Sequence, residues 1–354
     1  MYVPVEATGI LRRLGQGGDR VPDVMRRHVV AHSPVAYWPL TDGETAHQGS
    51  PVVGNQPLRT YALQEGWAGQ AISHTAGWAD GELHPWLDPV VSLPEEDRGR
   101  LGGTIRPASS STSWAVEIAQ RGFGTHDEIE LALEGSGTAD DPFRYWYVAW
   151  DVPNGNMYIS ILSETEDSSS ITIVDPDIDV PGLFDGEPHL YRFELSSDGS
   201  GSAYRLYRDG VSIASGTYGA PSRPLRRITY GWQVFDDGIS EHADLGHLSV
   251  WDMDSSSYPS PAANYAAFRG HAGERAAERV IRLCEENGVP LEMVGDPADS
   301  LRMGPQYPDA LLDLLYACQE VDGGVLFESR ESPSLAFRTL RSKYNRGAAL
   351  RDED

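Results

Sequence analysis

Three carboxylates recur at short intervals in the segment Glu128-Ile-Glu130-Leu-Ala-Leu-Glu134. Side chains alternate between the two faces of a β-strand, so an extended segment would place Glu128, Glu130 and Glu134 on one face. A pair of carboxylates that flanks a glycosidic bond can hydrolyse it, and in retaining enzymes the two groups stand roughly 5–5.5 Å apart. The segment therefore predicts either a hydrolytic pair or the solvated acidic face of a strand.

Two oxygen-rich segments could bind calcium, which takes its ligands from carboxylate and carbonyl oxygens. They are Asp175-Pro-Asp177-Ile-Asp179 and Asp236-Asp237-Gly-Ile-Ser-Glu241. Neither segment has the ligand spacing of an EF-hand, and a hydrated acidic turn is the alternative for each. Calcium is the one cofactor that the sequence suggests.

A sugar-binding site needs an aromatic face for the apolar side of a pyranose, beside carboxylates that accept hydrogen bonds from its hydroxyls. The candidates are Trp78, Trp86, Trp146 and Trp232 for the aromatic face, with Asp80, Asp236 and Asp237 as acceptors. Each tryptophan taken singly could instead pack in the core or at its rim. The sugar site depends on loops that meet at one end of the fold.

These residues lie in a long region of short strand-like runs. It opens with the alternating segment Ser33–Gly43, closes with Gly246–Asp254, and is punctuated by Gly, Pro, Asp and Ser. Such a pattern is typical of a two-sheet antiparallel sandwich, whose first and last strands we expect to be neighbours. Asp209-Gly210 predicts a tight hairpin, whereas residues 44–112 give the weakest pattern.

The flanks have a different pattern. A Ser/Pro-rich linker at 254–261 precedes helices expected at 274–287 and 308–321 and short strands expected at 291–294, 325–328 and 335–339. At the other end, residues 1–19 predict an edge strand and a turn, and 22–30 a short helix. The sequence therefore predicts a mainly β chain with an antiparallel jelly-roll sandwich at 34–253 and a smaller α+β domain at 262–354. Residues 1–33 are expected to pack against that smaller domain, because their small apolar stripe needs a partner.

The composition restricts the class of partner. A net charge of −25 on 354 residues, most of it within 34–253, argues against binding nucleic acid and suits cations or neutral glycans. No run of about 18 apolar residues occurs, so no membrane insertion is expected. Residues 1–6 lack the features of a secretory signal. Cys284 and Cys318, both in expected helices, do not indicate a disulfide framework.

Several blocks in the flanks resemble the minor tail proteins of actinobacterial phages and prophages. They are Gly9–Gly17, Pro34–Leu40, Met303–Gln306 with Leu311–Leu315, Asp322–Glu328 and Phe337–Asn345. The C-terminal module is similar to part of the tail-hub proteins that form trimeric rings. The resemblance implies a protein made in the host cytoplasm and located in the virion tail, a homotrimeric state, and other tail-tip or baseplate proteins as partners. Residues 1–33 and 262–354 would form one hub framework, and we expect the chain to be a fragment of a longer tail protein.

The middle of the chain is similar to concanavalin A-like, laminin G-like jelly rolls through His189–Leu195, Tyr204–Ile213 and Gly246–Trp251. Laminarinase-type members of that fold carry Glu-x-Asp-x-Glu or Glu-x-Asp-x-x-Glu on one strand, but here Ala132 or Leu133 stands at the last acidic position. We therefore expect no enzymatic activity. The hypothesis is a structural tail-tip protein whose jelly roll binds a host cell-wall glycan, and the alternatives are a glycan depolymerase and a spacer without a ligand.

Overall fold

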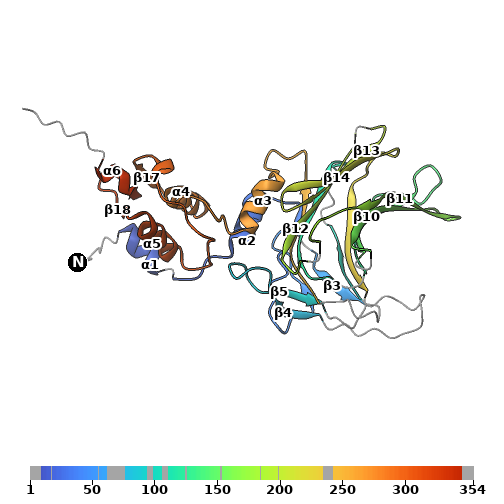
Figure 1. The fold of residues 1–354 in the computed structure, drawn as a ribbon, viewed down its shortest axis with the longest axis horizontal. Helices are drawn as coiled ribbons and strands as arrows, with labels where there is room; N and C mark the ends of the chain where they lie inside the picture. Colours follow the sequence, from blue (N-terminus) through green and yellow to red (C-terminus); the bar gives the residue numbers. More distant parts are fainter. Residues whose placement is uncertain are drawn as a thin grey trace, which may run out of the picture. The chain divides into compact units, whose positions relative to one another are not determined.

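The computed structural model describes residues 9–16, 18–54, 56–61, 76–93, 99–105, 111–123, 126–151, 154–183, 185–197, 199–233 and 242–344. The chain forms two compact units, one from residues 28–268 and one from residues 1–27 and 269–354 (Figure 1). The larger unit is an antiparallel β-sandwich and the smaller one is α+β. The expected fold class is confirmed.

The sandwich consists of two large sheets. The back sheet has the order β14-β13-β12-β7-β16-β5-β4, with β1 also paired to β16, and the front sheet has the order β11-β10-β9-β8-β15-β6-β3-β2. The back-sheet strands are β1 Ala36–Trp38, β4 Gly77–Gly81, β5 Val90–Leu93, β7 Trp114–Arg121, β12 His189–Ser197, β13 Ser202–Arg208, β14 Val211–Tyr218 and β16 Ala243–Asp252. The front-sheet strands are β2 Gln48–Gly49, β3 Leu58–Tyr61, β6 Gly99–Thr104, β8 His126–Leu133, β9 Phe143–Asp151, β10 Asn156–Glu164, β11 Ser169–Ile178 and β15 Leu225–Gln233.

The expected neighbours at the two ends of the sandwich sequence do pair. Strand β1 runs antiparallel to β16, with Ala36 opposite Val250 and Trp38 opposite Leu248. The expected hairpin is also confirmed, because Asp209 and Gly210 join β13 to β14 with φ of 55° and 77°. A two-residue turn with positive φ at both positions matches the twist of the strands that it connects.

The core of the sandwich lies between the sheets. Strand alternation buries Ile129 and Leu131 of β8, Trp146 of β9 and Phe193 of β12 in one apolar cluster. Burying an apolar side chain of this size stabilises the fold by about 1.5–3 kcal/mol. The same alternation turns the intervening residues of the front sheet away from the core, and these residues form the surface described below.

Residues 254–268, expected in part to be a linker, lie against the outer surface of the back sheet. Arg192 donates from Nε to Glu117 at 2.7 Å and from Nη1 to the carbonyl oxygen of Pro259 at 2.9 Å. Tyr258 donates to Glu194 at 2.6 Å, and Asn264 in helix α3 (Pro261–Phe268) donates to Glu117 at 2.5 Å. The boundary between the two units accordingly falls at Phe268, and α3 belongs with the sandwich.

The smaller unit combines helices with a three-stranded sheet of order β17-β19-β18, in which β17 and β19 are parallel. Its elements are α1 Ile10–Gln16, α4 Ala276–Glu286, β17 Leu291–Val294, the 3-10 helix η1 Pro297–Asp299, α5 Leu311–Asp322, β18 Val325–Glu328, β19 Leu335–Arg338 and α6 Leu340–Tyr344, and helix α2 (Val24–Ala31) spans the boundary in sequence. Leu283, Cys284, Leu315, Cys318 and Phe337 form its core.

The N-terminal segment completes this smaller unit. Residues 10–16 form a helix, because Ile10, Leu11 and Leu14 have a helical spacing and pack on the core. The edge strand expected from the alternation of Val3, Val5 and Ala7 lies outside the described residues. The backbone N–H of Leu11 donates to Glu328 at 2.9 Å, and that of Val21 donates to the carbonyl oxygen of Asp309 at 3.0 Å.

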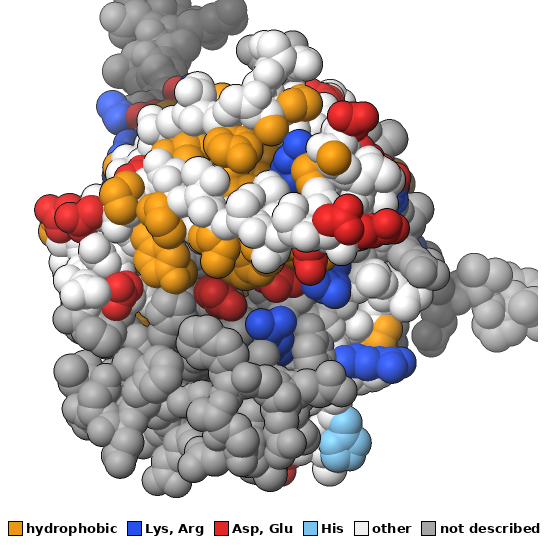
Figure 2. Space-filling view, turned by 90° about the vertical axis from the view of Figure 1, so that its right-hand side faces the viewer, with side chains coloured by type: hydrophobic (Ala, Val, Ile, Leu, Met, Phe, Trp, Pro, Cys, Tyr) orange, Lys and Arg blue, Asp and Glu red, His pale blue; other side chains and the backbone are white. Residues whose placement is uncertain are grey.

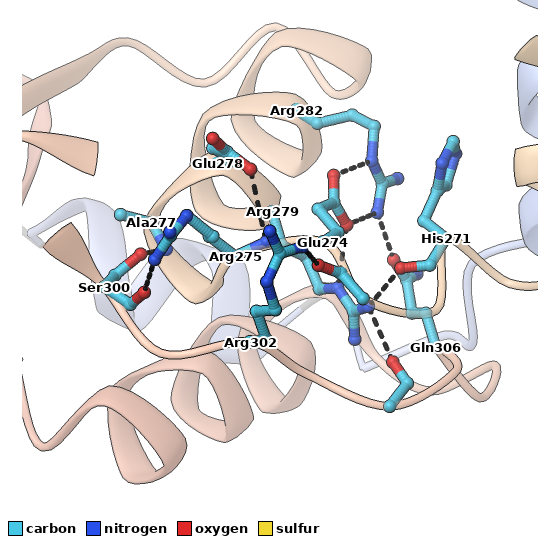
Figure 3. A network of polar contacts seen from close by, with 12 residues as sticks. His271, Glu274, Arg275, Ala277, Glu278, Arg279, Arg282, Ser300, Arg302 and Gln306 are labelled. Atoms are coloured by element: carbon cyan, nitrogen blue, oxygen red, sulfur yellow. Dashed lines mark hydrogen bonds and ion pairs between the residues drawn. The ribbon is translucent and has the colours of Figure 1, made fainter. Parts of the chain in front are cut away.

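A polar network fixes the loops of the smaller unit (Figure 3). Glu274 accepts from Nε of Arg279 at 2.9 Å and from Nε of Arg282 at 2.8 Å. Arg279 also donates to the carbonyl oxygen of Gly304 at 2.8 Å, and Arg282 donates to Gln306 at 2.7 Å. The block Met303–Gln306 is therefore held on α4 by these two arginines.

Candidate functional site

We call the surface of the front sheet that points away from the back sheet the front face. Two carboxylates lie at its centre, because Glu128 and Glu130 of β8 alternate with the buried Ile129 and Leu131. Side chains of the same orientation on the neighbouring strands surround them. These are Arg100 of β6, Tyr145 and Tyr147 of β9, Tyr158 of β10 and Arg227 of β15.

The carboxylate of Glu130 contacts side chains of three other strands, and 7% of the Glu130 side chain is exposed. Arg227 donates from Nη2 to its carboxylate at 2.7 Å, and Tyr147, its neighbour across the strands, donates from Oη at 3.2 Å. Arg100 lies 3.8 Å from the same carboxylate. Charge-assisted hydrogen bonds of this kind fix the orientation of a carboxylate.

Glu128 lies between two small residues of the neighbouring strands. Its neighbours across the strands are Ala149 and Gly231, neither of which has a bulky side chain. A Cβ on Gly231 would lie 3.5 Å from Cγ of Glu128 and 3.9 Å from Cγ of Arg100, so both long side chains extend over this glycine. Burial raises the pKa of Glu128, Arg100 lowers it and Glu130 raises it. Glu128 can therefore accept a hydrogen bond as a carboxylate and donate one when protonated.

The tyrosines of the front face stay protonated at neutral pH. Burial, followed by the charges of Glu128 and Asp151, raises the pKa of Tyr158 to about 12. Burial and the charges of Glu130 and Glu128 raise the pKa of Tyr147, and burial also raises that of Tyr145. Each phenol is a hydrogen-bond donor attached to a half-buried aromatic ring, a combination suited to ligands with one apolar and one polar side.

The structure does not bring the candidate tryptophans together. Trp78 and Trp146 are 4% and 1% exposed and belong to the sandwich core, so they cannot present a face to a sugar. Trp86 is half-buried and donates from Nε1 to the carbonyl oxygen of Phe268 at 2.9 Å. Trp232 lies in β15, but its side chain falls outside the described residues, and Asp80 is exposed on β4 of the back sheet.

The first predicted calcium segment is largely a strand. Asp175 and Asp177 lie within β11, where they accept from Oη of Tyr204 at 3.2 Å and from Nδ2 of Asn156 at 2.7 Å. Asp179 follows the strand and is exposed. No group of three or more His, Cys, Asp and Glu side chains in the described part of the chain could hold a metal ion. Asp236, Asp237 and Glu241 lie outside the described residues, so calcium binding there stays a prediction.

Sequence reasoning identified the centre of the front face but not its surroundings. Glu134 lies beyond the end of β8, is exposed and pairs with Arg226. Ala132 occupies the next outward position after Glu130, and its neighbours across the strands are Tyr145 and Arg227. The signal that could have revealed the tyrosines is the alternation of Tyr145 and Tyr147 with the buried Trp146 and Val148.

No protein-family model and no curated protein matches the sequence. Among solved structures, the chain is similar to the binding domain of botulinum neurotoxin DC in complex with SialylT, with 11% identity, a TM-score of 0.43 and coverage of 69% of this chain and 53% of that one. It is also similar to the receptor binding domain of botulinum neurotoxin D, with 10% identity, a TM-score of 0.39 and coverage of 70% and 56%. The chain spans about half the length of these structures.

Among the helices that the structure describes, none combines the length and the apolar character needed to cross a membrane.

Proposed function

We propose that the chain is a structural minor tail protein of a phage or prophage, and that its sandwich binds a glycan of the host surface through the front face. The observation that carries the binding half of the proposal is the ordered constellation around Glu128 and Glu130. Two carboxylates, two guanidinium groups and three tyrosines converge there on a single face of one sheet.

The chemistry of the front face matches that of a sugar. Carbohydrates present arrays of hydroxyl groups beside small apolar patches, and the front face offers fixed acceptors, fixed donors and aromatic rings. Because Glu130 is already paired with Arg227 and Tyr147, little side-chain entropy remains to be lost on binding. The net charge of −25 disfavours a polyanionic ligand. We therefore assign a neutral or cationic glycan.

The tail half of the proposal is supported by the sequence blocks in the flanks. The block Met303–Gln306 has a structural role, because Arg279 and Arg282 bind its Gly304 and Gln306. The segment containing Gly9–Gln16 packs against the same unit, so both ends of the chain contribute to one body. The virion location, the trimeric state and the tail-tip partners rest on the resemblance alone.

Binding without hydrolysis is favoured over the depolymerase alternative. Glu128 and Glu130 lie together on the front face, but the next outward position on β8 is Ala132. Its cross-strand neighbours Tyr145 and Arg227 supply no carboxylate. A hydrolase needs two carboxyl groups in separate roles, and Glu130 is engaged by Arg227 and Tyr147.

The test measures retention of the full chain on purified actinobacterial cell walls, with reducing sugar assayed in the supernatant. The proposal expects saturable retention without sugar release, weakened at least tenfold by Tyr158→Ala and by Glu128→Gln. Tyr344→Ala is the matched control, because Tyr344 is 79% exposed and lies in the smaller unit. Absence of retention, or equal loss in the control, would refute the glycan assignment, and sugar release would replace it with the depolymerase. The tail assignment fails if the protein is missing from purified virions.

A further inference from the structure

Strand β11 forms one edge of the front sheet. Among the described strands it is hydrogen-bonded to β10 alone, with Leu162 opposite Ile171 and Ser160 opposite Ile173. The N–H and C=O groups on its other side therefore have no strand partner within the described part of the chain. Figure 1 shows β11 at the margin of the sandwich. An open edge of this kind is a template for pairing with another strand.

The first half of β11 is unusually exposed for a strand that contains isoleucines. All five residues from Ser169 to Ile173 are exposed, Ile171 at 71% and Ile173 at 53%. Both isoleucines lie on the front face, because their partners Leu162 and Ser160 alternate with the buried Ile161. Phe143 at the start of β9 is also 40% exposed. Figure 2 shows hydrophobic side chains gathered on this side of the sandwich with acidic side chains around them. Exposed apolar groups of this kind commonly mark interaction sites.

Charge defines the kind of partner that this edge can accept. Residues 168–174 carry no charge, but Glu164, Glu166 and Asp167 precede them and Asp175, Asp177 and Asp179 follow. In the described part of the chain, Glu166, Asp167 and Asp179 make no ion pair. Glu166 and Asp167 lie in the turn that precedes β11, Asp175 and Asp177 lie within the strand, and Asp179 follows it, so acidic residues stand at both ends of the uncharged stretch. Both ends of this stretch are acidic. A second copy of the strand, paired antiparallel, would therefore bring acidic residues close to acidic residues at each end.

We propose that the β11 edge pairs with an extended segment of a partner protein that is apolar at alternate positions and basic at both ends. The apolar side chains of that segment lie beside Ile171 and Ile173, and its basic ends lie beside the two acidic groups. Backbone hydrogen bonds supply affinity, while the side chains select the partner, as in other cases of strand addition. Strands β9 and β10 lie between this edge and β8, which carries Glu128 and Glu130, and the inference does not depend on the proposed glycan.

The probe is a synthetic ten-residue peptide, Lys-Arg-Thr-Val-Thr-Val-Thr-Val-Arg-Lys, titrated into the full chain. We expect saturable binding that weakens as salt rises, with slower amide hydrogen exchange within 169–174. The chain with Ile171→Thr and Ile173→Thr should bind at least tenfold more weakly, and Asp167→Asn with Asp179→Asn should reduce both the affinity and its salt dependence. These four positions are on the surface, so the folds of the variants should be unchanged by circular dichroism.

Two control peptides sharpen the test. One carries Glu and Asp in place of the basic ends, and the other has proline at its two central positions, which removes N–H donors. Both should bind at least tenfold more weakly than the basic peptide. The proposal is overturned if the acidic peptide binds equally well, if no peptide binds at millimolar concentration, or if the isoleucine changes have no effect. Self-association in sedimentation velocity that the isoleucine changes abolish would assign the edge to a second copy instead.

Discussion

Replacing Glu274 by alanine should destabilise the smaller unit without affecting the sandwich. Glu274 accepts three hydrogen bonds, one from Arg279 at 2.9 Å and two from Arg282 at 2.8 Å each. Arg282 would keep Glu286 and Gln306 as partners, but Arg279, whose side chain is 4% exposed, would keep only carbonyl oxygens. Breaking a buried ion pair costs about 3–5 kcal/mol, and the 14% exposure of Glu274 indicates the lower end.

The two units can be monitored separately in the intact chain. All nine tryptophans lie within residues 28–268, whereas both cysteines lie within 269–354. Both cysteines are buried, and burial raises the pKa of Cys284 to about 11 and that of Cys318 to about 12, so fast labelling of either thiol requires the smaller unit to open. A loss of about 3 kcal/mol increases the population of the open state about a hundredfold. Thiol labelling of Glu274→Ala should therefore accelerate about a hundredfold at pH 7.

Glu320→Ala is the control, because Glu320 lies exposed on helix α5 of the same unit. Its labelling rate should stay within about threefold of the wild-type rate. The urea midpoint of tryptophan fluorescence should not move in either variant. An acceleration below tenfold in Glu274→Ala, or an equal change in Glu320→Ala, would refute the role given to Glu274.

Three further predictions concern the sandwich, and tryptophan fluorescence in urea measures each of them. Arg192→Met should lower the free energy of unfolding by about 3–5 kcal/mol, because it leaves Glu117 as a buried charge. Adding Glu117→Leu should restore most of this loss, and additive effects of the two substitutions would contradict the prediction. The pKa of Glu128 is raised, so the folded state binds the proton more tightly, and stability should fall as pH rises from the unfolded pKa through the folded one. Glu128→Gln should remove that part of the pH dependence, and an unchanged profile would exclude Glu128 as its source. Gly199→Ala should lower the free energy of unfolding by about 1–2 kcal/mol, because φ is positive there and the space around it is open. Gly210→Ala should lower it by more, because φ is positive there too and the new Cβ would lie 3.0 Å from Cα of Ala262. Equal losses in the two variants would contradict the contact with Ala262.

Parts of the sandwich could be predicted from the sequence where strands show a clear apolar pattern and where adjacent residues specify a turn. The Asp209-Gly210 hairpin and the pairing of β1 with β16 follow from such signals. Residues 10–16 could not be distinguished as a helix, because a short apolar run fits both periods until its packing partner is known. Helix α3 has little amphipathic pattern. It is positioned by Asn264, which donates to Glu117, and by the preceding Tyr258, which donates to Glu194. Both acceptors lie on strands of the back sheet that are distant from α3 in sequence.

The candidate site was predictable in part for the same reason. The spacing of Glu128 and Glu130 places them on one face of a strand without knowledge of the sheet. Arg227 and Tyr147 reach Glu130 only because β15 and β9 flank β8, and strand order is a property of the whole sandwich. Trp78 and Trp146 could not be assigned to the core by type alone, since a tryptophan suits a sugar site as well as an apolar core.

The most direct test of the central claim is amide hydrogen exchange of the full chain, with and without soluble fragments of actinobacterial cell walls. The account predicts slower exchange confined to peptides from β6, β8, β9, β10 and β15, which carry the side chains around Glu128 and Glu130, and none of this protection in Glu128→Gln. Protection of the back-sheet strands β12–β14 instead, or no change at saturating fragment concentration, would contradict the assignment of glycan binding to the front face.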